Sequence, residues 1–101
     1  MIAAPGASSL PQMTVRVPAP LMELTGGRDR LYLKARTVDE ALERIRETEP
    51  LLAGRLFADD GSVRGYINLF LNGADVRHLD AADRTVSRDS VLSIVPSVAG
   101  G

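Results

Sequence analysis

Alternating apolar and polar residues near the amino end predict two strands. In residues 13–17 (Met-Thr-Val-Arg-Val) every second side chain is apolar, and residues 31–35 (Leu-Tyr-Leu-Lys-Ala) repeat the alternation. This period of two places one face of each extended segment against a core. Pro18 and Pro20 end the first segment, and residues 21–29 have turn composition. The two segments therefore predict an antiparallel hairpin with a long connection.

A helical period follows the second segment. Thr37-Val38-Asp39-Glu40 is a capping box, in which the Thr37 hydroxyl accepts from the Glu40 amide and the Glu40 carboxylate reaches back to the Thr37 amide. Apolar residues then recur on one helical stripe: Val38, Ala41, Leu42 and Ile45. Pro50 marks the predicted helix end. Residues 51–57 are apolar but short, which predicts a tether packed on the core before a polar turn at residues 59–62.

Three further strands are predicted in the second half. Residues 66–71 put Ile67, Leu69 and Leu71 on one face and Tyr66, Asn68 and Phe70 on the other. Asn72-Gly73 is a hairpin turn pair, which predicts a short returning strand over residues 74–77. Residues 91–96 form the last predicted strand, with Leu92 and Ile94 inward.

The order of these elements predicts an α+β fold. Strand, strand, helix, strand, short strand and strand indicate a roll in which one main helix packs across a mixed sheet of about five strands. With 101 residues, of which 45% are hydrophobic and 25% charged, the chain has material for one core.

Charge and cysteine content exclude several functions. The net charge is −1 and arginines alternate with acidic residues, so we expect no nucleic-acid partner. The chain has no cysteine, which excludes disulfides and thiol chemistry and fits a cytoplasmic protein. No segment approaches the ~18 apolar residues of a membrane span, so we expect no membrane partner.

Three other features carry little chemistry. His78 is the only histidine and is expected in a surface turn, and Gly26-Gly27 lacks the Lys-Ser/Thr of a phosphate loop. The acidic residues at 59–60 and 80–83 lack calcium-loop spacing. We therefore predict no metal site, no tightly bound cofactor and no catalytic residue.

The chain divides into three expected parts. Residues 1–12 lack a basic start and a continuous apolar core, so they predict a flexible leader and not a signal peptide. Either Met1 or Met13 is the natural start. Residues 13–97 form the expected domain, and residues 98–101 form a carboxyl-terminal tail that ends in Gly100-Gly101.

Several motifs together point to a known family. They are Pro18, Thr25-Gly26-Gly27, Asn68-Leu69-Phe70-Leu71-Asn72, Asp75-Val76-Arg77 and the final Pro96-Ser97-Val98-Ala99-Gly100-Gly101. With the predicted element order, the chain resembles the β-grasp sulfur carriers of the MoaD and ThiS type, relatives of ubiquitin, and most closely the CysO-type carriers. It departs from the MoaD-like pattern at residues 87–90, where Ser-Arg-Asp-Ser replaces an Asp-Gly-Asp type turn.

The resemblance implies a carrier and not an enzyme. The Gly101 carboxylate would be adenylated by a separate MoeB/ThiF-like enzyme, which uses ATP and Mg, and then converted to a thiocarboxylate. Val98, Ala99 and Gly100 would thread into that enzyme, because residues with little or no side chain fit a narrow channel. Further implied partners are a sulfur-accepting synthase and a metalloprotease that releases the product from the tail. The free carrier is expected to be a monomer.

The resemblance also implies a docking surface on the exposed sheet face beside the tail. Its expected residues are Asn68, Phe70, Ser93, Val95 and Ser97, with Tyr66 alongside. An outward Phe next to an outward Val makes a small apolar patch of the kind that a partner protein binds.

Other functions stay open. The chain would be the small subunit of molybdopterin synthase if it forms a stable heterodimer, or a ubiquitin-like modifier if Gly101 is joined to lysine amines. A non-reactive binding module is a further alternative. Cysteine precursors, molybdopterin, thiazole, thiolated tRNA and secondary metabolites all remain open as the sulfur acceptor.

Overall fold

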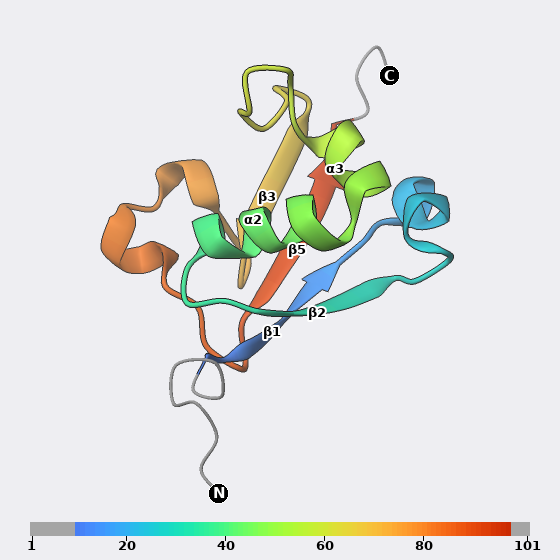
Figure 1. Cartoon of the computed structure of the whole chain (residues 1–101). Coiled ribbons are helices and arrows are strands. Elements are labelled where there is room, and N and C mark those ends of the chain that lie inside the picture. The colour runs from blue at the N-terminus through green and yellow to red at the C-terminus, as the bar shows by residue number, and fades with distance from the viewer. Residues whose placement is uncertain (1–9, 98–101) are drawn as a thin grey trace, which may run out of the picture.

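A five-stranded mixed sheet forms the centre of the computed structural model, which describes residues 10–97 (Figure 1). The strand order is β2-β1-β5-β3-β4. The strands are β1 (Gln12–Arg16), β2 (Arg30–Lys34), β3 (Ile67–Leu71), β4 (Ala74–Asp75) and β5 (Val91–Pro96). Only the β1–β5 pair is parallel among these pairings. The predicted hairpin of the first two strands and the predicted mixed sheet are both confirmed.

The ends of the domain differ slightly from the prediction. β1 begins at Gln12, inside the range expected as a leader, and the Ala35 amide donates to the Pro11 carbonyl at 3.1 Å. This backbone bond extends the pairing of β1 and β2 towards the amino end. Residues 1–9 of the predicted leader and residues 98–101 of the predicted tail lie outside the described part of the chain.

The main helix α2 (Val38–Thr48) begins at the predicted cap. Thr37 Oγ1 accepts from the Glu40 amide at 3.1 Å. The predicted donor to the Glu40 carboxylate is wrong by one residue. Glu40 Oε1 accepts from the Arg36 amide at 2.8 Å and not from the Thr37 amide. The Arg36 guanidinium lies 4.0 Å from the same oxygen, so charge attraction favours this partner.

A second helix replaces the predicted tether. α3 (Pro50–Leu56) begins with Pro50 at a first-turn position, where a missing amide proton costs nothing. Leu52 and Leu56, one helical turn apart, are both buried. Pro50 therefore ends one helix and starts the next. The tether was predicted to pack on the core, and that contact is observed.

Short 3-10 helices occupy the connections. They are η1 (Ala19–Thr25), η2 (Val76–His78) and η3 (Ala81–Arg84). β4 is shorter than the predicted residues 74–77, because the Asp75 carboxylate accepts from the Arg77 amide and caps η2. The predicted hairpin turn before β4 is present, with φ of 52° at Asn72 and 91° at Gly73. Positive φ at both central residues is typical of a type I′ turn.

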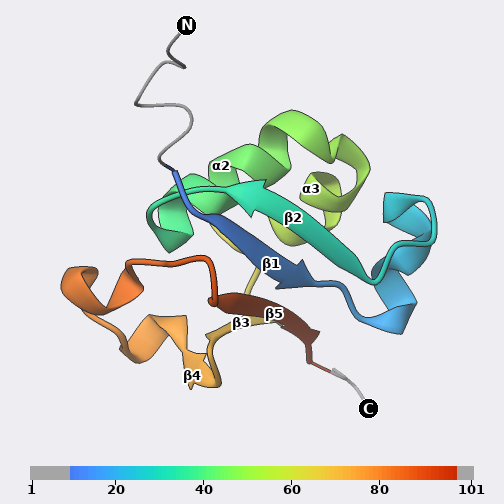
Figure 2. The same cartoon turned by 90° about the horizontal axis from the view of Figure 1, so that it is seen from below.

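The core lies between the sheet and the two α-helices. Ile67, Leu69 and Leu71 of β3 and Leu92 and Ile94 of β5 are buried, as the alternation predicts. Figure 2 shows α2 and α3 on the same side of the sheet. The opposite side, which we call the open face, carries the alternate residues of every strand.

Candidate functional site

Two hydrogen bonds hold Ser97, the last described residue, against β3 and the residue that precedes it. The Ser97 amide donates to the Tyr66 carbonyl at 2.6 Å. Ser97 Oγ accepts from Asn68 Nδ2 at 3.0 Å. We call Pro96 and Ser97 the tail root, because residue 98 is bonded directly to Ser97. The start of the tail is therefore held against β3 by backbone and side chain together.

Asn68 is in turn held from its other side. Its Oδ1 accepts from Arg77 Nη2 at 2.9 Å. Arg77 also binds the Asp75 carboxylate, with Nη2 to Oδ2 at 2.7 Å and Nε to Oδ1 at 3.1 Å. Asp75, Arg77, Asn68 and Ser97 thus form one polar chain from β4 to the tail root. Asn68 and Ser97 are among the predicted site residues, whereas Asp75 and Arg77 are not.

The polar chain has an electrostatic consequence at Asp75. Hydrogen bonds from the Arg77 side chain and then from the Arg77 amide lower the pKa of this carboxyl from its ordinary value of 3.8 to about 2. Asp75 is therefore ionised at every physiological pH. Its charge holds the Arg77 guanidinium in the position from which it binds Asn68.

The strand register brings the predicted docking residues together. Asn68 lies directly opposite Val95, and Phe70 directly opposite Ser93. Residues paired in this way share one face of a sheet. We call Asn68, Phe70, Ser93 and Val95 the docking patch. Val95 is 42% exposed, whereas Phe70 is half-buried, so the apolar surface is smaller than two fully outward side chains would give.

Basic residues lie next to the docking patch on the open face, along β1 and β2. Arg16 of β1 pairs with Ser93 of β5, and Arg30 of β2 pairs with Arg16. Lys34 lies further along β2, and all three basic side chains are exposed. We call Arg16, Arg30 and Lys34 the basic flank. Its positive charge favours a partner with an acidic surface.

A cavity of about 270 Å³ lies at the tail root, and we call it the tail-root pocket. Its walls come from η1, α3, the start of β3 and the end of β5. The lining residues are Pro20, Leu21, Arg55, Tyr66, Ile67, Pro96 and Ser97. No sequence pattern predicts this pocket, because its residues come from four separate segments.

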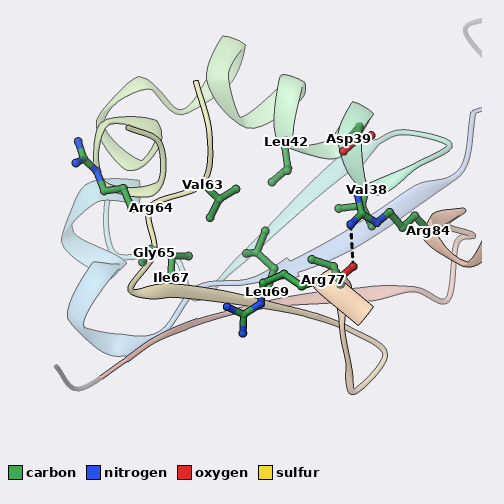
Figure 3. Close-up of a pocket in the computed structure, with 11 residues that line it drawn as sticks. Val38, Asp39, Leu42, Val63, Arg64, Gly65, Ile67, Leu69, Arg77 and Arg84 are labelled. Carbon is green, nitrogen blue, oxygen red and sulfur yellow. Dashed lines mark hydrogen bonds between the residues drawn. The ribbon is translucent and has the colours of Figure 1, made fainter. Parts of the chain in front are cut away.

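A second cavity, of about 260 Å³, lies between α2 and β3 (Figure 3). α2 supplies Val38, Asp39 and Leu42, and β3 supplies Ile67 and Leu69 (Figure 3). Because Ile67 and Leu69 face the helices, this cavity lies on the opposite side of the sheet from the docking patch.

Within residues 10–97, no three His, Cys, Asp or Glu side chains gather in an arrangement that would bind a metal ion. Over the same residues, no helix is both long and apolar enough to cross a bilayer. His78 is the last residue of η2 and is exposed. Val98, Ala99, Gly100 and Gly101 lie outside the described residues, and their roles stay predictions.

Comparison with known proteins gives three consistent similarities. The model of the ThiS family matches residues 15–101. Small archaeal modifier protein 3 of Haloferax volcanii is 37% identical over 65 residues, which cover 64% of this chain and 70% of that protein. Sulfur carrier protein CysO of Mycobacterium tuberculosis is 24% identical over 91 residues, covering 88% of this chain and 98% of that protein.

A solved structure agrees with these matches. The crystal structure of the BexX/CysO complex of Amycolatopsis orientalis contains a chain that is 30% identical, with a TM-score of 0.75. The alignment covers 88% of the present chain and 99% of the other. The predicted fold class, a β-grasp roll with a mixed sheet, is confirmed.

Proposed function

The chain belongs to the ThiS family, and from that premise we propose that it is a sulfur carrier protein that reacts through the carboxylate of Gly101. The observation that carries the proposal is the fixed tail root beside the docking patch. Ser97 is hydrogen-bonded to Tyr66 and Asn68, so the residues that follow it start from a defined point beside the proposed docking patch.

The proposed chemistry has two steps, both performed by a separate adenylating enzyme. A Gly101 carboxylate oxygen attacks the α-phosphorus of ATP, and the bond from that phosphorus to the bridging oxygen breaks. Pyrophosphate leaves with Mg²⁺ and an acyl-adenylate remains. A sulfide-level nucleophile then attacks the acyl carbon, and AMP leaves with one of the original carboxylate oxygens. The product is a thiocarboxylate, formed without oxidation or reduction.

The chain contributes binding and orientation. Four residues follow Ser97, and when fully extended they span at most about 14 Å. The enzyme must therefore open its active site within that distance of the tail root while it contacts the docking patch. Because the tail root is already fixed, fewer backbone conformations are lost when the enzyme binds the chain. This lowers the entropic cost of threading the tail into the enzyme.

The basic flank gives the expected partner a recognisable surface. Arg16, Arg30 and Lys34 would meet acidic side chains on the adenylating enzyme and accelerate the encounter. Val95 and Phe70 would supply the apolar contact. A second partner, which accepts the sulfur, would use the same tail, because both reactions need the same carbon atom.

ATP–pyrophosphate exchange tests the proposal. An adenylating enzyme of the ThiF type from the same genome should exchange labelled pyrophosphate into ATP only when the chain is added. A variant extended by one alanine after Gly101 should not support exchange, because it carries no carboxylate at the glycine. Exchange that is equally fast with the extended variant would contradict the end-on reaction.

A modifier function is a second candidate, favoured by the 37% identity with small archaeal modifier protein 3. The same acyl-adenylate would react with a lysine amine, AMP would leave and an isopeptide bond would form. Mass spectrometry of lysine-containing targets would detect the attached chain. The two products differ only in the nucleophile, so a single preparation of adenylated carrier tests both.

A further inference from the structure

We propose that the tail-root pocket binds an apolar side chain that stands next to a carboxylate on the adenylating enzyme. This inference rests on the proposed function, because the partner is the protein that receives the tail. It adds a second contact, separate from the docking patch.

The walls of the pocket are mostly apolar. Pro20 and Leu21 come from η1, Tyr66 and Ile67 from the start of β3, and Pro96 from the tail root. Figures 1 and 2 show α3 and η1 (blue) at the same end of the domain as the carboxyl end of β5. Leu21 and Ile67 are buried, so the floor of the pocket belongs to the hydrophobic core.

The pocket is large enough for one large side chain. Its volume of about 270 Å³ lies near the lower end of the range of ligand pockets, roughly 300–1,000 Å³. A pocket that admits one large apolar side chain is typical of the anchor points that dominate protein interfaces.

Arg55 places a positive charge at the rim of the pocket. It lines the pocket from the last turn of α3, and its side chain is exposed. A guanidinium binds a carboxylate through two parallel hydrogen bonds, which fixes orientation as well as position. An apolar side chain followed by Asp or Glu would therefore fill the apolar pocket and also pair with the Arg55 guanidinium.

The position of the pocket identifies the partner. Pro96 and Ser97 line it, and Val95 of the docking patch directly precedes Pro96. Leu21, Arg55 and Ile67 place the pocket on the helix side of the sheet, whereas Val95 lies on the open face. The two surfaces meet at the tail root, so an enzyme that takes in residue 98 lies beside the mouth of the pocket. With contacts on both sides of the tail root, the enzyme controls the direction in which the tail enters its active site.

Charge reversal at Arg55 tests the inference in the exchange assay. Arg55→Glu should raise the KM for the carrier by about tenfold. Arg55→Lys keeps the charge but loses the second parallel hydrogen bond, so its KM should lie between those of the original chain and of Arg55→Glu. Arg44→Glu is the matched control, because Arg44 lies on α2, pairs only with Glu47 of the same helix and does not line the tail-root pocket. Circular dichroism establishes that each variant is folded.

Tyr66→Ala tests the apolar wall in the same assay. Tyr66 is 42% exposed, and its loss should raise the KM severalfold with kcat unchanged. Glu47→Ala is the control, since the Glu47 side chain is 58% exposed on α2 and does not line the tail-root pocket. Ultracentrifugation tests a second copy as the occupant: a dimer of the original chain that Arg55→Glu dissociates would overturn the inference.

The outcomes separate the inference from the proposed function. If the original chain supports exchange and the Arg55 and Tyr66 variants behave like their controls, the pocket is not a contact and the carrier proposal stands. If the original chain supports no exchange with any adenylating enzyme of its genome, the carrier proposal and the inference both fail.

Discussion

Asn68 donates a hydrogen bond from Nδ2 to Oγ of Ser97 at 3.0 Å, and this bond ties β3 to the residue from which the tail extends. The same side chain accepts from Arg77 at 2.9 Å. Asn68 therefore uses both ends of its amide, and Arg77 and Asp75 restrict its orientation. The polar chain gives the tail a fixed starting point on the open face of the sheet.

Removing the Asn68 amide should loosen the tail root. Asn68→Ala loses two side-chain hydrogen bonds in a partly exposed position, so we expect a loss of about 1 kcal/mol in the free energy of unfolding. The KM for the carrier in the exchange assay should also rise. Ser97→Ala is the milder comparison, because the bond from the Ser97 amide to Tyr66 remains. A larger effect at Ser97 than at Asn68 would contradict the polar chain.

The Asp75 carboxyl should titrate far below its ordinary range. Carbon-detected NMR should give a pKa of about 2, and Arg77→Ala should return it towards 3.8. Because the folded pKa is the lower one, the stabilising contribution is complete above pH 3.8 and is lost as the pH falls from about 3.8 through about 2. Arg88→Ala should leave the titration unchanged. An unshifted Asp75 in the original chain would exclude the ion pair in solution.

The cap of α2 should contribute measurably to stability. Thr37→Ala removes the acceptor for the Glu40 amide, and we expect a loss of about 1 kcal/mol in urea unfolding. Thr85→Ala is the matched control, since the Thr85 hydroxyl is exposed and donates only to the Ala82 carbonyl at 3.2 Å. Equal losses in the two variants would show that the cap is not the cause.

Two glycines should respond to alanine in opposite directions. Gly54 lies in α3 with open space at its Cβ position, so Gly54→Ala should stabilise the domain by about 0.4–1 kcal/mol. Gly73 has a φ of 91°, which an alanine adopts only with strain, so Gly73→Ala should destabilise the turn. Thermal unfolding of both variants measures the signs. A destabilised Gly54→Ala or a stabilised Gly73→Ala would contradict the described backbone.

The sequence predicts the elements whose pattern is local. Alternation identified the inward residues of β3 and β5, and the capping box located the start of α2, because each depends on residues close together in the chain. α3 was missed because its run is short and Pro50 was interpreted only as a helix end. The polar chain and the tail-root pocket were missed for a different reason. Arg77 meets Asn68 only after the Asn72-Gly73 turn reverses the chain, and the pocket needs four segments in place.

The proposed function depends on the conversion of Gly101 to a thiocarboxylate. Intact mass spectrometry tests it after incubation of the chain with an adenylating enzyme, ATP, Mg²⁺ and sulfide. We expect a mass gain equal to the difference between one sulfur and one oxygen, located at Gly101 by fragmentation and absent without ATP. An unchanged mass with every adenylating enzyme of the same genome, or sulfur found at any other residue, would contradict it.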